Sequence, residues 1–179
     1  MKVVEKALNG VILFEPSVYG DSRGYFFESY RDSLVKEHRI TEDFLQDNES
    51  LSKKNVLRGL HLQRSPMAQG KLVRVTSGAV LDVAVDVRSD SSTFGQHFKA
   101  VLSHENKRIM YIPPGFAHGF LSLKENTRFL YKCTNYYNKE SEDGILWNDP
   151  TLNIEWGVKN PIVSDKDLEL PLFTNFKPE

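Results

Sequence analysis

The sequence predicts an all-β fold, a sandwich or barrel with a few short helices, and a jelly roll fits the number of expected strands. Two observations favour this class. Short segments rich in β-branched and aromatic side chains recur along the chain, with clusters of turn residues between them. Aromatic residues make up 11% of the sequence, which also favours β-structure. With 179 residues and no repeat or linker, the chain is expected to form one domain, residues 1–179.

The expected strands follow from composition and turn signals, taken in chain order. Pro16 follows the apolar run 11–14, and aromatic side chains mark residues 24–30. The polar turn 52–55 separates the segments 46–51 and 56–63. A hairpin signal at residues 77–79 separates the segments 71–76 and 80–87. The expected strands are Val11–Phe14, Gly24–Tyr30, Gln46–Leu51, Val56–Gln63, Lys71–Thr76, Val80–Val87, His97–Leu102, Arg108–Ile112, Gly119–Leu123 and Phe129–Thr134.

The segment Val80–Val87 shows the alternation of a strand most clearly, with Leu81, Val83, Val85 and Val87 on one face and Asp82, Ala84 and Asp86 on the other. Helical signals are confined to two places. Arg31–His38 could form two turns, and Ser164 is typical of an N-cap that opens a short helix over Ser164–Asp167.

Charge and cysteine content limit the possible functions. The 23 basic and 24 acidic residues give a net charge of −1, which gives no support to a nucleic-acid-binding or membrane-binding protein. Cys133 is the only cysteine, so no intramolecular disulfide can form, and a reducing compartment is the simplest interpretation. Charges interrupt residues 1–6, and no apolar run approaches a membrane span. We therefore expect a cytoplasmic protein.

Arg58 and His61 are polar residues within an otherwise apolar strand. They are three residues apart, so they face opposite sides of a regular strand, although Gly59 could mark a bulge that changes this. Taken alone, a histidine in such a strand is more often a structural residue than a functional one.

Two further strands place polar groups among apolar ones. Lys71 projects with Val73 and Val75, towards the core or a cavity unless it lies at the strand end. Tyr131 shares a face with Phe129 and Cys133. A tyrosine there is usually a core residue, but its phenol stays protonated at neutral pH and could donate a proton.

Two polar groupings could bind a ligand. Gln46, Asn48 and Ser50 share one face of an unusually polar strand, which is either a solvated edge or a wall of amide groups for a polar ligand. Arg23 lies close to Tyr19 and Tyr25, a combination that would suit the phosphate and base of a nucleotide. The sequence has no glycine-rich phosphate loop.

A metal site is not expected. Residues 114–118 match Pro-Gly-x-x-His, the second half of the cupin pattern. Metal-binding cupins also have a His-x-His pair and a nearby glutamate, but the corresponding stretch here is His61-Leu-Gln63. The imidazole ligand set is therefore incomplete.

Together these segments resemble the dTDP-4-dehydrorhamnose 3,5-epimerase family. The matching stretches occur in family order from about residue 10 to 168: residues 20–29, 44–48, 55–63, 69–75, 82–86, 93–95, 112–120, 131–132, 145–149 and 164–167. Their ordered combination is specific, although residues 65–67 and Gly157 depart from the usual pattern.

The resemblance implies a cupin-type jelly roll, a homodimer, no cofactor, and a nucleotide-linked 4-keto-6-deoxy sugar as substrate. The 4-ketone acidifies the hydrogens at C3 and C5, so that a base can remove each proton and an acid can return one from the opposite face. By resemblance His61 is the base, Asp167 its partner, Lys71 the group that stabilises the enolate, and Tyr131 the acid. Asp82 remains an alternative partner for His61.

The resemblance also implies the substrate-binding residues. These are Arg23, Glu28, Gln46, Asp47, Asn48, Arg58, Lys71, His118, Glu142 and Lys166. The alternatives are an epimerase that acts at C3 or C5 alone, a cupin that only binds a nucleotide sugar, and a metal-dependent oxygenase. The presence of both His61 and Tyr131 favours the double epimerase.

Overall fold

The computed structural model describes residues 1–178 and confirms an all-β fold with short helices. Its strands are β1 (Lys2–Ala7), β2 (Val11–Glu15), β3 (Val18–Asp21), β4 (Gly24–Phe27), β5 (Gln46–Ser52), β6 (Leu57–Gln63), β7 (Lys71–Ser77), β8 (Ala79–Asp86), β9 (His97–Ser103), β10 (Ile109–Ile112), β11 (Phe116–Ser122), β12 (Thr127–Cys133) and β13 (Glu142–Gly144). The helices are α1 (Asp32–Lys36) and α2 (Asp165–Leu168), with 3₁₀ turns at Lys139–Ser141 and Phe173–Asn175.

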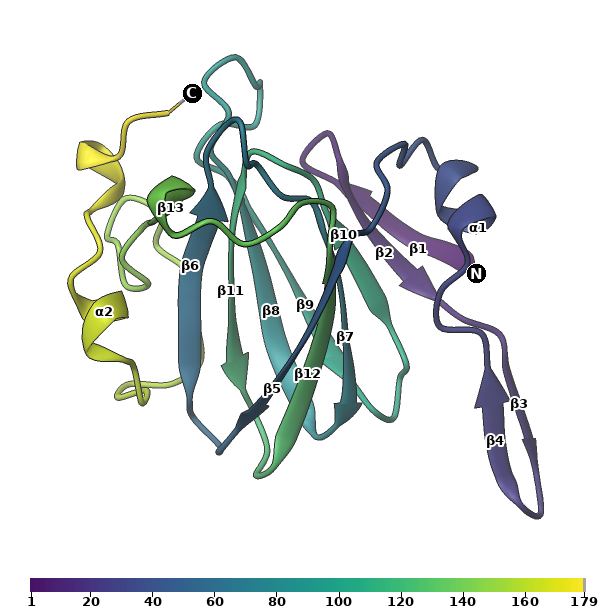
Figure 1. The fold of residues 1–179 in the computed structure, drawn as a ribbon. Helices are drawn as coiled ribbons and strands as arrows, with labels where there is room; N and C mark the ends of the chain where they lie inside the picture. The colour runs from purple at the N-terminus through teal and green to yellow at the C-terminus, as the bar shows by residue number, and fades with distance from the viewer. Residues whose placement is uncertain (179) are drawn as a thin grey trace.

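Two antiparallel sheets form the jelly roll (Figure 1). The six-stranded sheet has the order β1-β2-β10-β7-β12-β5, and the five-stranded sheet has the order β13-β6-β11-β8-β9. Neighbouring strands are distant in sequence, as in the pairing of β2 with β10 and of β6 with β11. This topology brings side chains of β6, β7, β11 and β12 to the lining of one cavity, beside which a second cavity lies.

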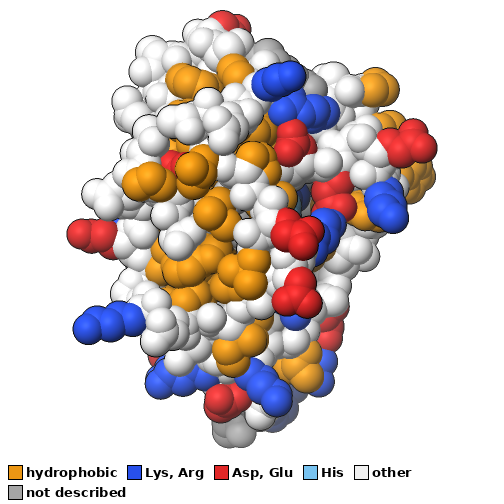
Figure 2. All heavy atoms as spheres, turned by 90° about the vertical axis from the view of Figure 1, so that its left-hand side faces the viewer, with side chains coloured by type: hydrophobic (Ala, Val, Ile, Leu, Met, Phe, Trp, Pro, Cys, Tyr) orange, Lys and Arg blue, Asp and Glu red, His pale blue; other side chains and the backbone are white. Residues whose placement is uncertain are grey.

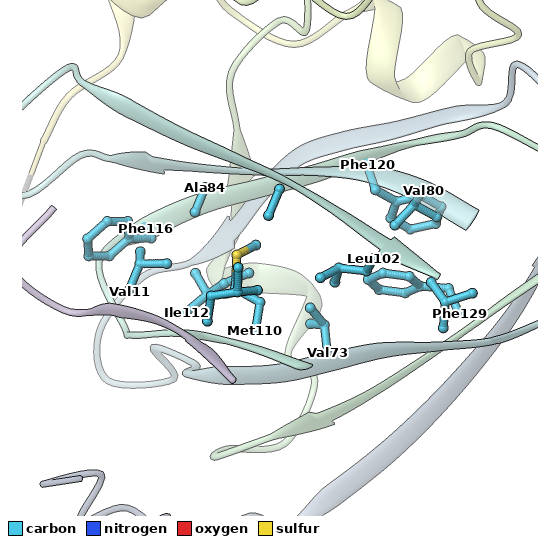
Figure 3. Packing of buried hydrophobic residues seen from close by; sticks show 13 residues of the cluster. Val11, Val73, Val80, Ala84, Leu102, Met110, Ile112, Phe116, Phe120 and Phe129 are labelled. Carbon is cyan, nitrogen blue, oxygen red and sulfur yellow. The ribbon is translucent and has the colours of Figure 1, made fainter. Parts of the chain in front are cut away.

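The main core lies between the two sheets, where apolar side chains from both inner faces interdigitate. Figure 3 shows Met110 and Ile112 of one sheet among Ala84, Leu102 and Phe120 of the other. Val80 and Ala84 belong to this inner cluster, so they share a face with Asp82. The buried Asp82 is therefore a polar group inside the barrel.

The C-terminal segment covers the outer face of the five-stranded sheet. Val83 and Val85 point outward to Trp156 and Phe176, in a second apolar cluster that explains why both faces of this sheet are buried. A parallel bridge between Val56 and Ile162 holds the segment against the start of β6. Figure 2 views this side of the molecule, where hydrophobic side chains gather in the middle and charged ones lie around them.

The ten strands predicted from sequence are all present and in the predicted order, with ends that differ by a few residues, but residues 1–178 contain three further strands, β1, β3 and β13. The segment Gly24–Tyr30 forms a strand only to Phe27, where β4 pairs with β3 in a hairpin. This hairpin projects away from the barrel (Figure 1). The predicted helix at 31–38 is shorter than expected, and Ser164 caps α2 as predicted, because its side chain accepts a hydrogen bond from Asp167 N.

None of the helices in residues 1–178 is long and apolar enough to cross a membrane.

Candidate active site

A β-bulge places Arg58 and His61 on the same side of β6. His61 is opposite His118 on β11, and Arg58 is opposite Phe120, so three steps along β6 match two along β11. The extra residue is Gly59, with a φ of +113°. A Cβ atom here would lie 2.6 Å from the Gly119 Cα atom, so only glycine fits. Gly59 therefore forms the bulge that the sequence left open, and Arg58 and His61 face the same side of β6.

Two adjoining cavities open beside this strand, with volumes of about 510 Å³ and about 290 Å³. His61, Lys71 and Tyr131 line both cavities, so these three side chains stand where the cavities meet. Arg58, His118, Lys166 and Asp167 line the larger cavity, which we call the cleft. Gln46, Asn48 and Glu142 line the smaller one, which we call the side cavity.

His61 and Asp167 form a hydrogen-bonded pair. The distance from His61 Nε2 to Asp167 Oδ1 is 2.7 Å, and the second carboxylate oxygen accepts a hydrogen bond from Gly59 N at 3.1 Å. Burial raises the pKa of Asp167, but the hydrogen bond and charge of His61 and the Gly59 amide outweigh it, and the net pKa lies below the ordinary value. An ionised Asp167 fixes the proton of a neutral His61 on Nε2.

The remaining nitrogen of His61 is available to a substrate. Among the described residues no hydrogen bond reaches its Nδ1 atom. The His61 side chain is 30% exposed, whereas that of Asp167 is 5% exposed. The buried carboxylate therefore orients an imidazole that faces the cavity.

Asp82, the alternative partner of His61, is paired with a different histidine. His118 Nε2 lies 2.9 and 3.1 Å from the two carboxylate oxygens of Asp82, and both residues are buried. Burial lowers the pKa of His118, and the charge of Asp82 only partly opposes this shift. His118 is thus a neutral imidazole at the wall of the cleft, opposite His61 in the strand register.

Lys71 and Tyr131 supply a cation and a phenol at the junction of the cavities. The Lys71 ammonium donates to His61 O at 3.4 Å, and burial lowers the pKa of Lys71. Burial also raises the pKa of Tyr131, so its phenol keeps its proton. No other described residue forms a hydrogen bond with the Tyr131 hydroxyl, which leaves it available to a ligand.

The polar face of β5 lines the cavities rather than a solvated edge. Gln46 and Asn48 face the side cavity and Ser50 faces the cleft. Gln46 donates to Asn48 Oδ1 at 3.1 Å, and Asn48 donates to the sulfur of Cys133 at 3.7 Å. The amide wall considered from the sequence is therefore present.

Charged groups also meet at the rim. Arg58 donates to Ser52 Oγ at 3.2 Å and forms no ion pair with a residue in the range 1–178. The Lys166 ammonium lies 2.6 Å from Glu142 Oε2, which also accepts a hydrogen bond from the Tyr137 hydroxyl at 2.9 Å. Burial raises the pKa of Glu142, but these two donors outweigh it and the net pKa is lowered.

Three residues expected to bind substrate lie outside both cavities. Arg23 is at the tip of the β3–β4 hairpin, paired with Asp21. Glu28 forms an ion pair with Arg31. Asp47 points to the opposite side of β5 from Gln46 and Asn48, and binds Lys132.

Several residues that line the side cavity were not predicted as site residues: Gln63, Gln69, Cys133 and Tyr137. A signal for Gln63 existed, because it lies two residues beyond His61 on the same face of the strand. Gln63 occupies the position of the second histidine of metal-binding cupins, and its amide is bound to the main chain. Within residues 1–178 no group of three His, Cys, Asp or Glu side chains is arranged to hold a metal ion.

The arrangement suits proton transfer at carbon next to a carbonyl group. It offers an oriented imidazole, a protonated phenol and a partly buried lysine where the two cavities meet. Fold and site together define a jelly-roll enzyme of the cupin type with the acid–base groups of an isomerase.

The comparisons with known proteins identify the family. A sequence profile described as dTDP-4-dehydrorhamnose 3,5-epimerase matches residues 5–175, and the chain belongs to this family. The enzyme of that name from Salmonella typhimurium is 54% identical over 176 residues, which cover 96% of this chain and 95% of that protein.

Two solved structures are similar along nearly the whole chain. The dTDP-4-dehydrorhamnose 3,5-epimerase of Bacillus anthracis, with TDP and PPi bound, has a TM-score of 0.94 and 46% identity over 96% of this chain and 99% of that one. The Legionella pneumophila epimerase, in complex with dTDP-4-keto-L-rhamnose, has the same TM-score and identity over 98% of this chain and 94% of that one.

Proposed function

We propose that this protein converts dTDP-4-dehydro-6-deoxy-D-glucose into dTDP-4-dehydro-L-rhamnose by epimerisation at C3 and C5, with no cofactor. The observation that carries this proposal is the meeting of the His61–Asp167 pair, Lys71 and Tyr131 at the junction of two cavities. The names of the relatives support the same reaction.

The reaction begins with removal of a proton from carbon. The 4-ketone acidifies the hydrogens at C3 and C5, so Nδ1 of His61 accepts a proton while the C–H electron pair moves onto the ketone oxygen. Asp167 stabilises the imidazolium that forms, as carboxylates do beside catalytic histidines. The ammonium of Lys71 stabilises the enolate oxygen by its charge.

Inversion follows when Tyr131 donates its phenolic proton to the same carbon from the opposite face. The enolate electron pair returns to form the new C–H bond and restores the ketone. His61 then releases its proton to solvent and Tyr131 takes one up, so the site is ready for the second carbon. No redox change occurs at any step.

The substrate's diphosphate and nucleoside require further contacts. Arg58 and Lys166 are cations at the cleft, suited to phosphate oxygens. Gln46 and Asn48 offer amide groups, and Glu142 and His118 complete the polar lining.

We also propose a homodimer, in which the hairpin of one copy serves the site of its partner. Tyr19 and Phe26 on the hairpin are 68% and 71% exposed, which is unusual for aromatic residues of a monomer. The hairpin projects away from the barrel (Figure 1), and neither Arg23 nor Glu28 lines the cleft or the side cavity of its own chain, so we expect both to contact a nucleotide bound to a second copy. The single, buried thiol of Cys133 supports a cytoplasmic location.

Incubation with dTDP-4-keto-6-deoxyglucose in deuterated water, followed by NMR, tests the reaction. We expect deuterium at both C3 and C5 and accumulation of the L-sugar. Deuterium at one carbon only would identify a single-site epimerase, and binding without exchange would identify a non-catalytic protein. Either result would refute the double epimerisation.

Mixing two inactive variants tests the shared site. Arg23→Ala and His61→Ala should each lose activity as pure proteins. After exchange of subunits, random pairing should recover about a quarter of the wild-type activity, because half of the dimers contain one intact site. No recovery from a preparation shown to contain mixed dimers would place Arg23 in the site of its own chain or outside the site.

A further inference from the structure

The loop 134–138 carries aromatic residues to the rim of the side cavity. It leaves β12 after Cys133 and ends at the 3₁₀ turn Lys139–Ser141. Tyr136 and Tyr137 in this loop are 58% and 56% exposed, and Tyr137 lines the cavity. An exposed aromatic ring on a loop has little packing to fix its position, so other contacts must hold Tyr137 at the side cavity.

Three glutamine side chains bind four consecutive residues of the loop. Gln69 Nε2 donates to Asn135 O at 2.7 Å, and Gln63 Nε2 donates to Tyr136 O at 3.0 Å. Gln46 Oε1 accepts from Tyr137 N at 3.0 Å, and Gln63 Oε1 accepts from Asn138 N at 2.7 Å. Side-chain amides thus provide for these four residues the main-chain partners that a strand would provide.

Gln63 is the central member of this group. It is 5% exposed, and its Nε2 also donates to Met67 O at 2.6 Å, so both amide protons and the amide oxygen are bound. Gln63 belongs to β6, two residues beyond His61. The strand that carries the candidate base therefore also fixes the position of the loop 134–138 at the rim of the side cavity.

The loop in turn positions a group that meets the ligand. The Tyr137 hydroxyl donates to Glu142 Oε2, which also binds the Lys166 ammonium at the mouth of the cleft. Neither Gln63 nor Gln69 is hydrogen-bonded to the side chains of His61, Asp167, Lys71 or Tyr131. Displacement of the loop would alter the rim while the acid–base groups stay in place.

We propose that Gln63, with Gln69, is a positioning residue that acts through Tyr137 and sets the affinity for the nucleoside diphosphate part of the substrate. It takes no part in proton transfer. This inference rests on the proposed function in taking a nucleotide sugar as the ligand.

A double-mutant cycle of Gln63→Leu and Tyr137→Ala tests the proposal, with dTDP as the binding probe. We expect Gln63→Leu to raise KM, and Kd for dTDP, by about tenfold, while kcat stays within about twofold of wild type. In the Tyr137→Ala background the same change should have little further effect. Tyr136→Ala, on the same loop but outside both cavities, and Gln96→Leu, an exposed glutamine that lines neither cavity, are matched controls expected to leave Kd unchanged.

Other outcomes would overturn the proposal. These are a fall in kcat at unchanged KM, a Kd that does not change, or a loss of affinity that is fully additive with that of Tyr137→Ala. If Gln63→Leu does not fold, Gln69→Leu removes one loop contact and should raise Kd with the same dependence on Tyr137. Wild-type activity is measured first, so failure of the proposed epimerisation is seen independently of the variants.

Discussion

His61 and Asp167 lie 106 residues apart in the sequence and share a hydrogen bond of 2.7 Å. His61 comes from the middle of β6 inside the jelly roll, whereas Asp167 comes from a short helix in the segment that covers the outside. The carboxylate reaches the imidazole because Ser164 caps the helix and the Gly59 amide binds the other carboxylate oxygen. The pair therefore depends on correct docking of the C-terminal segment.

Replacement of Asp167 by asparagine should slow hydrogen exchange at C3 and C5 by about 10²–10⁴-fold, because the imidazolium loses its counter-charge and His61 its preferred tautomer. Asp82→Asn should be less harmful to exchange, since Asp82 binds His118. Solvent-deuterium incorporation measured by NMR compares the two. A larger loss in Asp82→Asn would show that the His118 pair is the more important one.

Tyr131→Phe should separate proton removal from inversion. The variant keeps the ring and removes a hydroxyl that no described residue binds, so stability should change by less than about 1 kcal/mol. His61 remains, so exchange at carbon should continue while the yield of L-sugar falls sharply. The assay compares the exchange rate with product formation. Normal inversion in this variant would mean that the acid is another group, such as Tyr136, Tyr137 or water.

The alkaline side of the pH–rate profile should report on Lys71. Burial lowers the pKa of this ammonium, so as pH rises the cation is lost before the usual lysine value of about 10.4 is reached. Activity that needs the cation should then fall on the alkaline side below that value. Burial moves the pKa of Tyr131 upward from the ordinary tyrosine value, in the opposite direction to that of Lys71. Lys71→Arg, which stays charged, should lower kcat but shift the alkaline limb upward; an unchanged limb would assign it to another group.

Gly59→Ala should destabilise the protein and impair catalysis together. The new methyl group would stand 2.6 Å from Gly119 Cα and from His118 O, and alanine disfavours a φ of +113°. We expect a loss of about 3 kcal/mol or more in the free energy of unfolding, measured by urea denaturation. Gly157→Ala is the control, because Gly157 also has a positive φ of +76° but nothing lies within 4 Å of its added Cβ. Equal losses in both variants would show that backbone strain alone, without the clash, decides the effect.

Activity should survive prolonged dialysis against EDTA. The three groups at the positions of cupin ligands have other partners, since His61 binds Asp167, His118 binds Asp82, and the Gln63 amide binds the main chain. Rates measured before and after dialysis, and after addition of Mg²⁺ or Zn²⁺, check this expectation. A strict requirement for a divalent ion would contradict the proposed cofactor-free mechanism.

Much of the fold could be predicted because each strand carries its own alternation. The inward directions of Lys71 and Tyr131 followed from the side chains two residues away, and the structure agrees. The strand β13 could not be predicted, since Glu142–Gly144 has no strand propensity and forms one only by pairing with β6. Only the second strand of the β3–β4 hairpin was predicted, as part of Gly24–Tyr30, and β3 was not.

The site was harder to predict where it depends on contacts between distant segments. The family resemblance favoured Asp167 as the partner of His61, but the residues themselves left Asp82 open as an alternative, because the choice depends on where the C-terminal segment docks. The sequence distinguishes Gln63 only as a departure from the cupin His-x-His pair. Nothing in the neighbouring residues shows that its amide binds a loop more than 70 residues away. The faces of Arg58 and His61 depended on one backbone conformation at Gly59.

The extra residue in β6 has a role other than turning side chains. If Gly59 were deleted from the gene, the shortened strand would still alternate correctly, with Arg58 and His61 facing inward and Leu60 outward between them. The deletion would remove the main-chain N–H group of Gly59, which donates a hydrogen bond to the Asp167 carboxylate. The extra glycine thus gives the sheet one donor beyond those of its ladder, and with it a way to bind a carboxylate from outside the sheet.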